Sequence, residues 1–335
     1  VGGDGAPYPA AGASVGATVV GDRPSTIAFA GDVHFEGELR SRLDDPSSAL
    51  DPIAGELGAA DLTVLNLESA VGTGGTREDK RYTFQAPPQV FDALAAAGVD
   101  AVSMANNHAG DYGFDGLADA LAAADGKVEV VGVGEDAASA FEPAAFDVDG
   151  TTVAVLAASA ADHDPTADPT GHWAATGDRP GVASALEPDR LIEAVEAARR
   201  DADVVVVYLH WGIQGDSCPS EAQTELARAL AEAEADIVVG SHTHRLQGAG
   251  VLDDGPYVAY GLGNFVWYTQ ASAATTSTGV LTLTVEDGDV VDEDWAPAAI
   301  ASDGLPRPTD DPPSERFGTP FGELRECAGV SPLGE

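Results

Sequence analysis

Residues 99–113 read VDAVSMANNHAGDYG, and their character changes abruptly in the middle. The first six residues form an apolar, strand-like run. Two amides, an imidazole and a carboxylate follow it at once. Polar groups at the end of a buried strand cost free energy unless a partner or a ligand satisfies them. This stretch therefore predicts a strand that delivers polar side chains to a site.

Four other apolar runs end in the same way, at residues 26–30, 62–65, 204–209 and 237–239. Five of the seven histidines of the chain lie at such strand ends. In α/β folds, ligands bind beyond the carboxyl ends of the strands, so the five clusters are expected to meet at one place. The polar segments after these four runs are Gly31-Asp32-Val33-His34, Asn66-Leu67-Glu68, His210-Trp211-Gly212 and Gly240-Ser241-His242-Thr243-His244.

The candidate ligands combine carboxylate, amide and imidazole groups and include no thiolate, which suits paired Mn, Fe or Zn and is too rich in nitrogen for calcium. Each piece alone has an ordinary structural explanation, such as a capped histidine or a turn. Their coincidence at five strand ends favours a joint metal site. Two pairs are spaced i, i+2, so on an extended chain each pair points to one side. The predicted ligands are Asp32, His34, Glu68, Asn107, His210, His242 and His244.

From residue 26 onward, strand-like and helix-like patterns alternate. The strands are short and apolar on both faces, which is typical of buried sheets and predicts a layered α/β fold. A domain is expected over residues 25–300, preceded by a linker at 1–24 and followed by a tail at 301–335 that packs on the domain or stays mobile. Residues 162–180 read as a long loop of the kind that is often functional or disordered. Helical patterns fall at 50–60, 87–97, 113–124, 187–202 and 219–235.

The charge of the chain is strongly one-sided, with 16 basic against 56 acidic residues and a net charge of −40. Such a surface repels nucleic acid, which needs a basic footprint. Because 44% of the residues are apolar and periodic, the charge belongs to the surface of a folded protein, and it suits a salty or alkaline (halophilic) medium. No apolar run reaches about 18 residues, so no membrane-spanning helix is predicted.

Cys218 and Cys327 show no metal-binding spacing. They are free thiols in a reducing compartment, whereas in an exported protein they can pair and tie the tail to the body. Residues 1–21 are rich in Gly, Ala and Pro and resemble a linker left after signal removal. Export to the cell surface or the medium, with or without an anchored precursor, is therefore expected.

The ordered motifs over residues 26–267 resemble the CapA family of poly-γ-glutamate capsule proteins, within the calcineurin-like metallophosphoesterase superfamily. The motifs that carry the resemblance are Gly31-Asp32, Asn66-Leu67-Glu68, Ala105-Asn106-Asn107-His108 with Asp111-Tyr112-Gly113, Leu209-His210-Trp211-Gly212, Gly240-Ser241-His242-Thr243-His244 and Tyr260-Gly261-Leu262-Gly263-Asn264-Phe265. The resemblance implies a β-sandwich flanked by helices, with two divalent metals at the carboxyl ends of the strands.

Carried over by position, the resemblance implies one metal at Asp32, His34 and His244 and a second at Asn107, His210 and His242. Glu68 would bridge them where ordinary phosphoesterases place an aspartate, and its extra methylene is expected to alter the metal spacing. Metal-assisted hydrolysis follows, with His108 as the general acid. Asp111 either orients His108 or belongs to a structural turn.

Arg77, Lys80 and Arg81 fall within five residues of a chain that is poor in basic residues. An ordinary solvated loop would explain them, but their place after the Glu68 cluster favours a basic lip that receives an anionic group. Arg245, directly after His244, is expected to act likewise.

Three functions remain open from the sequence. The first is an exported two-metal hydrolase acting on a phosphoester or on poly-γ-glutamate in capsule metabolism. The second is a non-catalytic assembly or polymer-binding protein that works beside membrane-bound synthesis proteins. The third, an intracellular phosphodiesterase or nucleotidase, is favoured if the two cysteines are unpaired.

Overall fold

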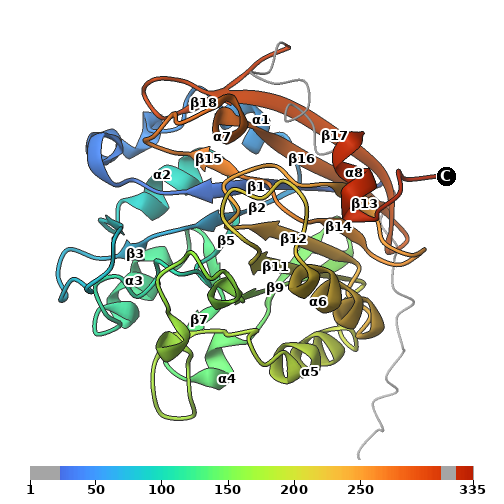
Figure 1. Ribbon diagram of the computed structural model, residues 1–335, viewed down its shortest axis with the longest axis horizontal. Helices are drawn as coiled ribbons and strands as arrows, with labels where there is room; N and C mark the ends of the chain where they lie inside the picture. Colours follow the sequence, from blue (N-terminus) through green and yellow to red (C-terminus); the bar gives the residue numbers. More distant parts are fainter. Residues whose placement is uncertain (1–22, 311–321, 335) are drawn as a thin grey trace, which may run out of the picture.

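The computed structural model describes residues 23–310 and 322–334 of the 335 residues. In this part of the chain two mixed β-sheets face each other and helices lie on the outer sides (Figure 1). The layered, helix-flanked β-sandwich predicted from the sequence is therefore confirmed. The first 22 residues of the predicted linker, and residues 311–321 and 335 of the predicted tail, lie outside the described residues.

The first sheet has eight strands. Its parallel half consists of β1 (Ser25–Val33), β2 (Leu62–Leu67), β5 (Ala101–Ser103) and β6 (Glu129–Val131). On the other side of β1 the sheet continues antiparallel through β16 (Ser277–Glu286), β17 (Asp289–Ile300) and β18 (Pro306–Pro308), while β15 (Asn264–Val266) lies parallel to β1.

The second sheet has six strands. Its parallel strands are β9 (Thr151–Ser159), β11 (Val204–His210), β12 (Ile237–Ser241) and β14 (Tyr257–Ala259), and antiparallel β8 (Ala144–Val148) and β13 (Ala249–Val251) form its edges. Two short pairs stand apart: β3 (Ala70–Val71) with β4 (Gln85–Ala86), and β7 (Val133–Gly134) with β10 (Gly181–Val182).

The main core lies between the two sheets. Inward-facing residues of both sheets, such as Phe29 of β1 and Val206 of β11, form one buried apolar cluster. Their neighbours along the chain, such as Ala28 and Val205, point to the outer faces. Because successive strand residues point to opposite faces, strands that are covered on both sides must be apolar throughout, as the sequence pattern indicated.

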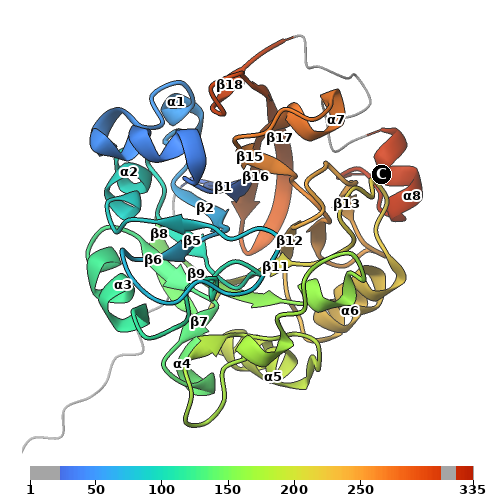
Figure 2. The ribbon, with the colours of Figure 1, turned by 60° about the vertical axis from the view of Figure 1, so that its left-hand side comes forward.

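The helices complete the layers. The longer ones are α2 (Val90–Ala96) and α3 (Leu117–Ala124) on the first sheet, and α5 (Asp189–Ala198) and α6 (Glu221–Glu232) on the second, as Figure 2 shows from another side. Each predicted helix contains an observed one, with shorter bounds. The remaining short helices are α1 (Ala54–Leu57), α4 (Ala137–Ala140), α7 (Ala273–Thr276) and α8 (Glu323–Ala328), with single 3₁₀ segments η1 (Gly37–Asp44), η2 (Pro46–Ser48), η3 (Ala161–His163) and η4 (Gly171–Trp173).

Strand β17 is the main element that the sequence analysis missed, since residues 289–300 carry four acidic side chains and lack a clear apolar alternation. The signal for it lay in the turn before it. Asp287 and Gly288 both have positive φ, at 55° and 91°. An Asp-Gly pair of this kind joins two strands in a tight hairpin.

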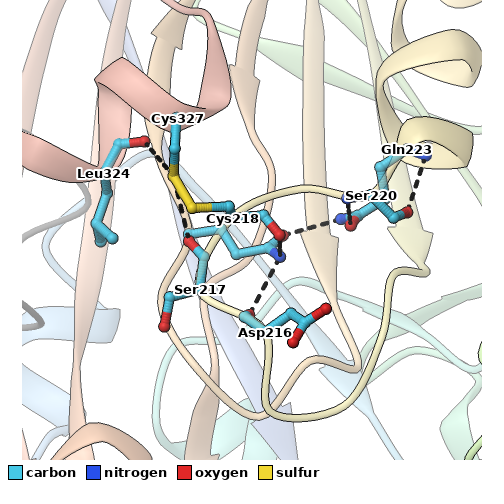
Figure 3. The surroundings of a disulfide bond; sticks show 8 residues. Asp216, Ser217, Cys218, Ser220, Gln223, Leu324 and Cys327 are labelled. Carbon is cyan, nitrogen blue, oxygen red and sulfur yellow. Dashed lines mark hydrogen bonds between the residues drawn. A yellow bond between two sulfur atoms is a disulfide. The ribbon is translucent and has the colours of Figure 1, made fainter.

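The end of the chain is fastened to the second sheet. A disulfide joins Cys327 of α8 to Cys218 in the loop before α6 (Figure 3). In addition, Arg325 donates from Nε to the carbonyl of Ala249 in β13 at 2.6 Å. The described part of the predicted tail therefore packs on the domain. No helix among the described residues is long and apolar enough to cross a membrane.

Candidate metal centre

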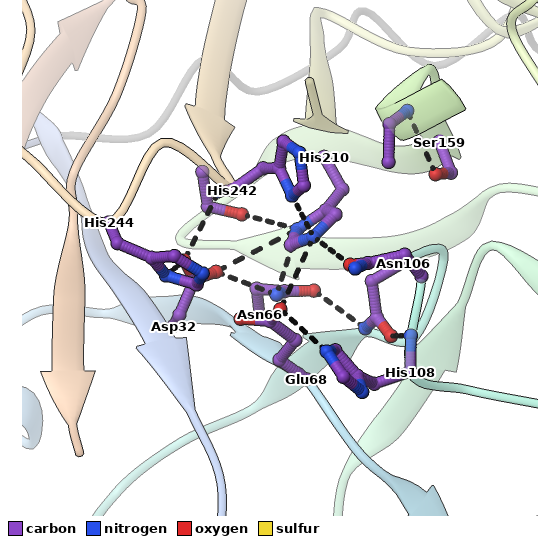
Figure 4. A network of polar contacts seen from close by, with 12 residues as sticks. Asp32, Asn66, Glu68, Asn106, His108, Ser159, His210, His242 and His244 are labelled. Atoms are coloured by element: carbon purple, nitrogen blue, oxygen red, sulfur yellow. Dashed lines mark hydrogen bonds and ion pairs between the residues drawn. The ribbon is translucent and has the colours of Figure 1, made fainter. Parts of the chain in front are cut away.

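The carboxyl ends of the central strands of both sheets meet at one place. Asp32 of β1 is in register with Asn66 of β2, and His210 of β11 is in register with Ser241 of β12. Tyr208 links the two sheets there by donating its hydroxyl to the carbonyl of Ala30 at 2.7 Å. The polar residues that end these strands thus face one another across the sandwich (Figure 4).

Gly31 allows the chain to reach this edge. The backbone of residue 263 approaches so closely that a Cβ on Gly31 would lie 2.0 Å from its carbonyl oxygen. The neighbouring Asp32 N–H donates to the same carbonyl at 2.8 Å. A side chain at this position would therefore displace the strand that presents Asp32.

One group of ligand atoms gathers around His210. Its Nε2 lies 2.7 Å from Oδ1 of Asn107, 3.0 Å from Nδ1 of His242 and 3.5 Å from Oε1 of Glu68. A second group consists of Asp32, Glu68 and His244, and His244 places Nδ1 3.4 Å from Asp32 Oδ2. Within each group of acidic and histidine side chains the ligand atoms lie within 4.8 Å of one another. Glu68 belongs to both groups.

The Glu68 carboxylate supplies the test of whether metal ions fit. Its side chain is 0% exposed, and neither oxygen has a hydrogen-bond partner among the described residues. Burial raises the pKa of this carboxyl well above its usual range. A buried carboxylate without a partner is costly, whereas cations on both sides of it would satisfy its oxygens. The residues therefore fit a pair of bound metal ions.

The protonation of His210 and His242 suits this interpretation, whereas His244 is protonated in the metal-free protein and must lose its proton to bind a metal. Burial lowers the pKa of His210 to about 3 and that of His242 to about 4, so both imidazoles are neutral and can act as ligands. Burial also acts to lower the pKa of His244, but the Glu68 and Asp32 carboxylates outweigh it and raise that pKa to about 9.

The turn after β12 presents His242 and His244 in a way that the sequence analysis did not foresee. The expected extended chain is wrong here, because both residues have positive φ, at 90° and 55°. Such values are rare and strained for residues other than glycine, and they cluster at functional sites. Both rings reach the site through this turn, and the N–H of His242 donates to Asp32 Oδ2 at 3.1 Å.

Besides Asn107, the loop after β5 brings three further polar side chains to the same edge. Asn106 donates to Asn66 Oδ1 at 3.1 Å and accepts from the N–H of His108 at 3.0 Å. His108 places Nδ1 2.5 Å from Asp111 Oδ2, and its Nε2 faces Glu68 Oε1 at 3.7 Å. Asp111 therefore orients His108, and it also accepts from the N–H of Phe84 at 2.6 Å, so it holds the loop as well.

His34 lies apart from the two groups of ligand atoms. Its ring stacks on Phe84 with 4.5 Å between centroids and meets Trp267 and Tyr268 edge-on. Nδ1 accepts from the N–H of Glu36 at 3.0 Å, while Nε2 is buried and has no partner among the described residues. The predicted role of His34 as a ligand stays a prediction that rests on this free nitrogen.

The residues of the predicted basic lip lie in different surroundings, some exposed and one buried. Arg77 and Arg81 are exposed, but the Lys80 side chain is only 7% exposed and donates to Asp111 Oδ1 at 2.6 Å and to the carbonyl of Asn107. The Lys80 ammonium also lies 4.7 Å from the centre of the Trp173 ring. Lys80 is thus an internal support of the Asp111 carboxylate, while Arg245 is half-buried with Nε unpartnered among the described residues.

The sequence analysis missed Asp164, which contacts the predicted ligand His242. It lies in the predicted long loop at 162–180 and places Oδ2 3.2 Å from Nε2 of His242. Sequence alone gave only a weak signal, namely that long loops in compact domains are often functional.

Residues 26–269 match the family model of bacterial capsule synthesis proteins, PGA_cap. The chain belongs to that family. A poly-γ-glutamate (PGA) biosynthesis protein CapA of Bacillus subtilis is 35% identical over 56% of this chain and 48% of its own length. A capsule biosynthesis protein CapA of Bacillus anthracis is 32% identical over 69% of this chain and 55% of its own length. The chain thus spans about half the length of these curated relatives, and the predicted CapA resemblance is confirmed.

Solved structures share the fold at much lower identity. A phosphatase of Mycoplasma pneumoniae is 14% identical, with a TM-score of 0.51 over 83% of this chain and 94% of its own. A hypothetical protein of Thermus thermophilus is 18% identical, with a TM-score of 0.50 over 81% and 98%. The chain therefore shares its fold with these two proteins.

We expect the wild-type protein to bind about two divalent metals, and His210→Ala to bind about one, because the first group of ligand atoms then loses its central nitrogen. Elemental analysis after loading with Mn²⁺ and desalting measures the ratio. His163→Ala, in the exposed part of the 162–180 loop, is the control. Two metals retained in His210→Ala would contradict the assignment.

We expect Lys80→Met to destabilise the metal-free protein by about 3 to 5 kcal/mol above neutral pH, because the buried Asp111 carboxylate loses its counter-charge. Burial raises the pKa of Asp111 to about 6, against the lowering effect of Lys80. A raised pKa means that stability from this group is present at low pH and is lost as the pH rises through 6.

Without Lys80 this pKa rises further, so the deficit of the variant relative to wild type should be nearly constant below about pH 6 and should grow above it, where Asp111 is ionised in wild type but still protonated in the variant. Urea denaturation at several pH values measures it. The double variant Lys80→Met, Asp111→Asn should show no such growth. A deficit that is equal at every pH would rule out this account of Lys80.

Proposed function

We propose that this chain is a two-metal hydrolase that acts on an anionic substrate in poly-γ-glutamate capsule or cell-envelope metabolism. The observation that carries the proposal is the Glu68 carboxylate, which is shared by two groups of ligand atoms and has no hydrogen-bond partner among the described residues. Membership of the capsule synthesis family and the fold shared with a phosphatase support it.

Asp32, Glu68 and His244 would hold one metal, with His34 as a further candidate, and Asn107, His210, His242 and Glu68 would hold the other. Mixed oxygen and imidazole donors favour Mn, Fe or Zn. When bound, such a pair of cations supplies Lewis-acid activation of water and of the scissile group.

His108 is proposed as the general acid. Its Nδ1 is held by Asp111, so Nε2 is the nitrogen that faces the site, and it would protonate a leaving group from the doubly protonated ring, although burial lowers the pKa of His108 well below its usual range. Lys80 and the N–H of Phe84 in turn fix the two oxygens of Asp111. The orientation of the His108 imidazole is thus set by Asp111 and its donors, which are not themselves proposed to touch the substrate.

The substrate is proposed to be a phosphoester or poly-γ-glutamate, received by Arg77, Arg81 and Arg245. The net charge of −40 would repel a free polyanion at low salt. Screening at about 1 M salt, where the Debye length is about 3 Å, removes most of that repulsion. The basic side chains therefore matter most as local contacts within an acidic surface.

We also propose that the protein acts at the cell surface or outside the cell, where disulfides persist, and the Cys218–Cys327 bond supports this. The pairing also speaks against the intracellular nucleotidase that the sequence left open. A Mycobacterium tuberculosis relative, 29% identical over 62% of this chain and 56% of its own length, is named a probable polyglutamine synthesis accessory protein. Membrane-bound synthesis proteins are the partners that an assembly role would require.

The test is turnover of a generic phosphodiester and of poly-γ-glutamate by the Mn²⁺-loaded protein. We expect His108→Ala to keep both metals and to lose roughly 10²- to 10⁴-fold in kcat, the usual contribution of a general acid. Metal content and initial rates are measured on the same samples. Loss of metal in His108→Ala would contradict its role as an acid, and wild-type protein that binds metal without turnover would favour the assembly role.

We expect Arg77→Ala and Arg81→Ala to raise KM for the anionic substrate with little change in kcat, because these exposed side chains lie outside the reacting groups. Arg228→Ala, which removes an exposed arginine paired with Asp253, is the matched control for a lost positive charge. Steady-state kinetics at low salt measure the effect. Unchanged KM in both variants would eliminate the basic lip.

A further inference from the structure

The long 162–180 loop reaches the metal centre through a single carboxylate. Asp164 follows the 3₁₀ segment η3 and is 2% exposed. Its Oδ2 lies 3.2 Å from Nε2 of His242, which is the ring nitrogen on the side away from His210. Among the described residues of this loop, Asp164 alone makes a hydrogen bond or ion pair to a predicted ligand.

Both oxygens of Asp164 are fixed by other donors. Oδ1 accepts from the N–H and the hydroxyl of Thr166, each at 2.7 Å. Oδ2 accepts from the N–H of Gln214 at 2.9 Å. A carboxylate held by three donors cannot turn away, and hydrogen bonds of this kind keep it ionised.

In the hydrogen bond between Asp164 and His242, the histidine is therefore the donor and the carboxylate the acceptor. An ionised carboxylate is only an acceptor, so Nε2 of His242 must carry the proton and donate it. The neutral ring then has its lone pair on Nδ1, the nitrogen that lies 3.0 Å from Nε2 of His210 in the first group of ligand atoms. Without Asp164 the ring could place its proton on either nitrogen, and one of the two forms cannot bind a metal there.

We propose that Asp164 is a positioning residue that holds His242 in the tautomer and orientation needed to bind metal through Nδ1. The inference rests on the proposed metal centre and adds to it a residue from a loop outside the strand ends. It concerns one metal only, since His244 in the second group contacts Asp32 and Trp267 instead. Carboxylates behind metal-binding histidines typically raise metal affinity 10- to 100-fold.

The test compares Asp164→Ala and Asp164→Asn with wild type in the full chain. We expect Asp164→Ala to weaken one of two Mn²⁺ binding steps by about 10- to 100-fold and to leave the other unchanged. Asp164→Asn keeps an acceptor without the charge, so a smaller loss is expected. Calorimetric titration of the metal-free protein with Mn²⁺ resolves the two steps.

Asp162→Asn is the matched control. Asp162 lies two residues earlier and holds the same loop by accepting from Thr170 and Gly171, without contacting the metal centre. Wild-type binding in Asp162→Asn together with one weakened step in Asp164→Ala would support the proposal. Equal losses in both variants would attribute the effect to loop folding and overturn it, as would unchanged binding in Asp164→Ala.

A second readout needs no metal. Nitrogen-15 NMR of labelled histidine should show His242 protonated at Nε2 in metal-free wild type, and a mixture of tautomers in Asp164→Ala. Wild type protonated at Nδ1 would overturn the proposal. Wild-type protein that binds no metal would overturn the proposed function, and the His242 signals would still decide whether Asp164 sets the tautomer.

Discussion

The placement of the Glu68 carboxylate in the dry interior is the constraint on which the rest of the site depends. Neither of its oxygens has a hydrogen-bond donor among the described residues, so the site must hold cations or a proton there. The surrounding groups serve this requirement in two ways. On one side of Glu68, the neutral imidazoles of His210 and His242 offer lone pairs. On the other side lie the Asp32 carboxylate and the protonated imidazole of His244.

Two sheets rather than one make this arrangement possible. The first sheet supplies carboxylates and amides through β1, β2 and β5, and the second supplies imidazoles through β11 and β12. The apolar cluster between the sheets brings the two sets to one edge. Loops then add the outer supports, Asp111 and Lys80 behind His108 and Asp164 behind His242.

Most of the fold and the set of candidate ligands could be predicted, because an apolar run that ends in polar residues can be recognised from the amino-acid sequence alone. The supports could not. Lys80 reads as a surface charge, and only the contact with Asp111 shows that it is internal. Asp164 contacts a residue 78 positions away, which no local pattern records. Strand β17 was missed because its outward acidic residues hide the alternation.

The bond between Cys218 and Cys327 closes a covalent ring that spans 109 positions of the chain. His242, His244 and Arg245 all lie inside this ring, whereas His210 and the ligands of the first sheet lie outside it. Any single backbone cut between the two cysteines leaves both pieces joined through sulfur. His242 and His244, two of the seven predicted metal ligands, would thus stay attached to the rest of the protein after such a cut.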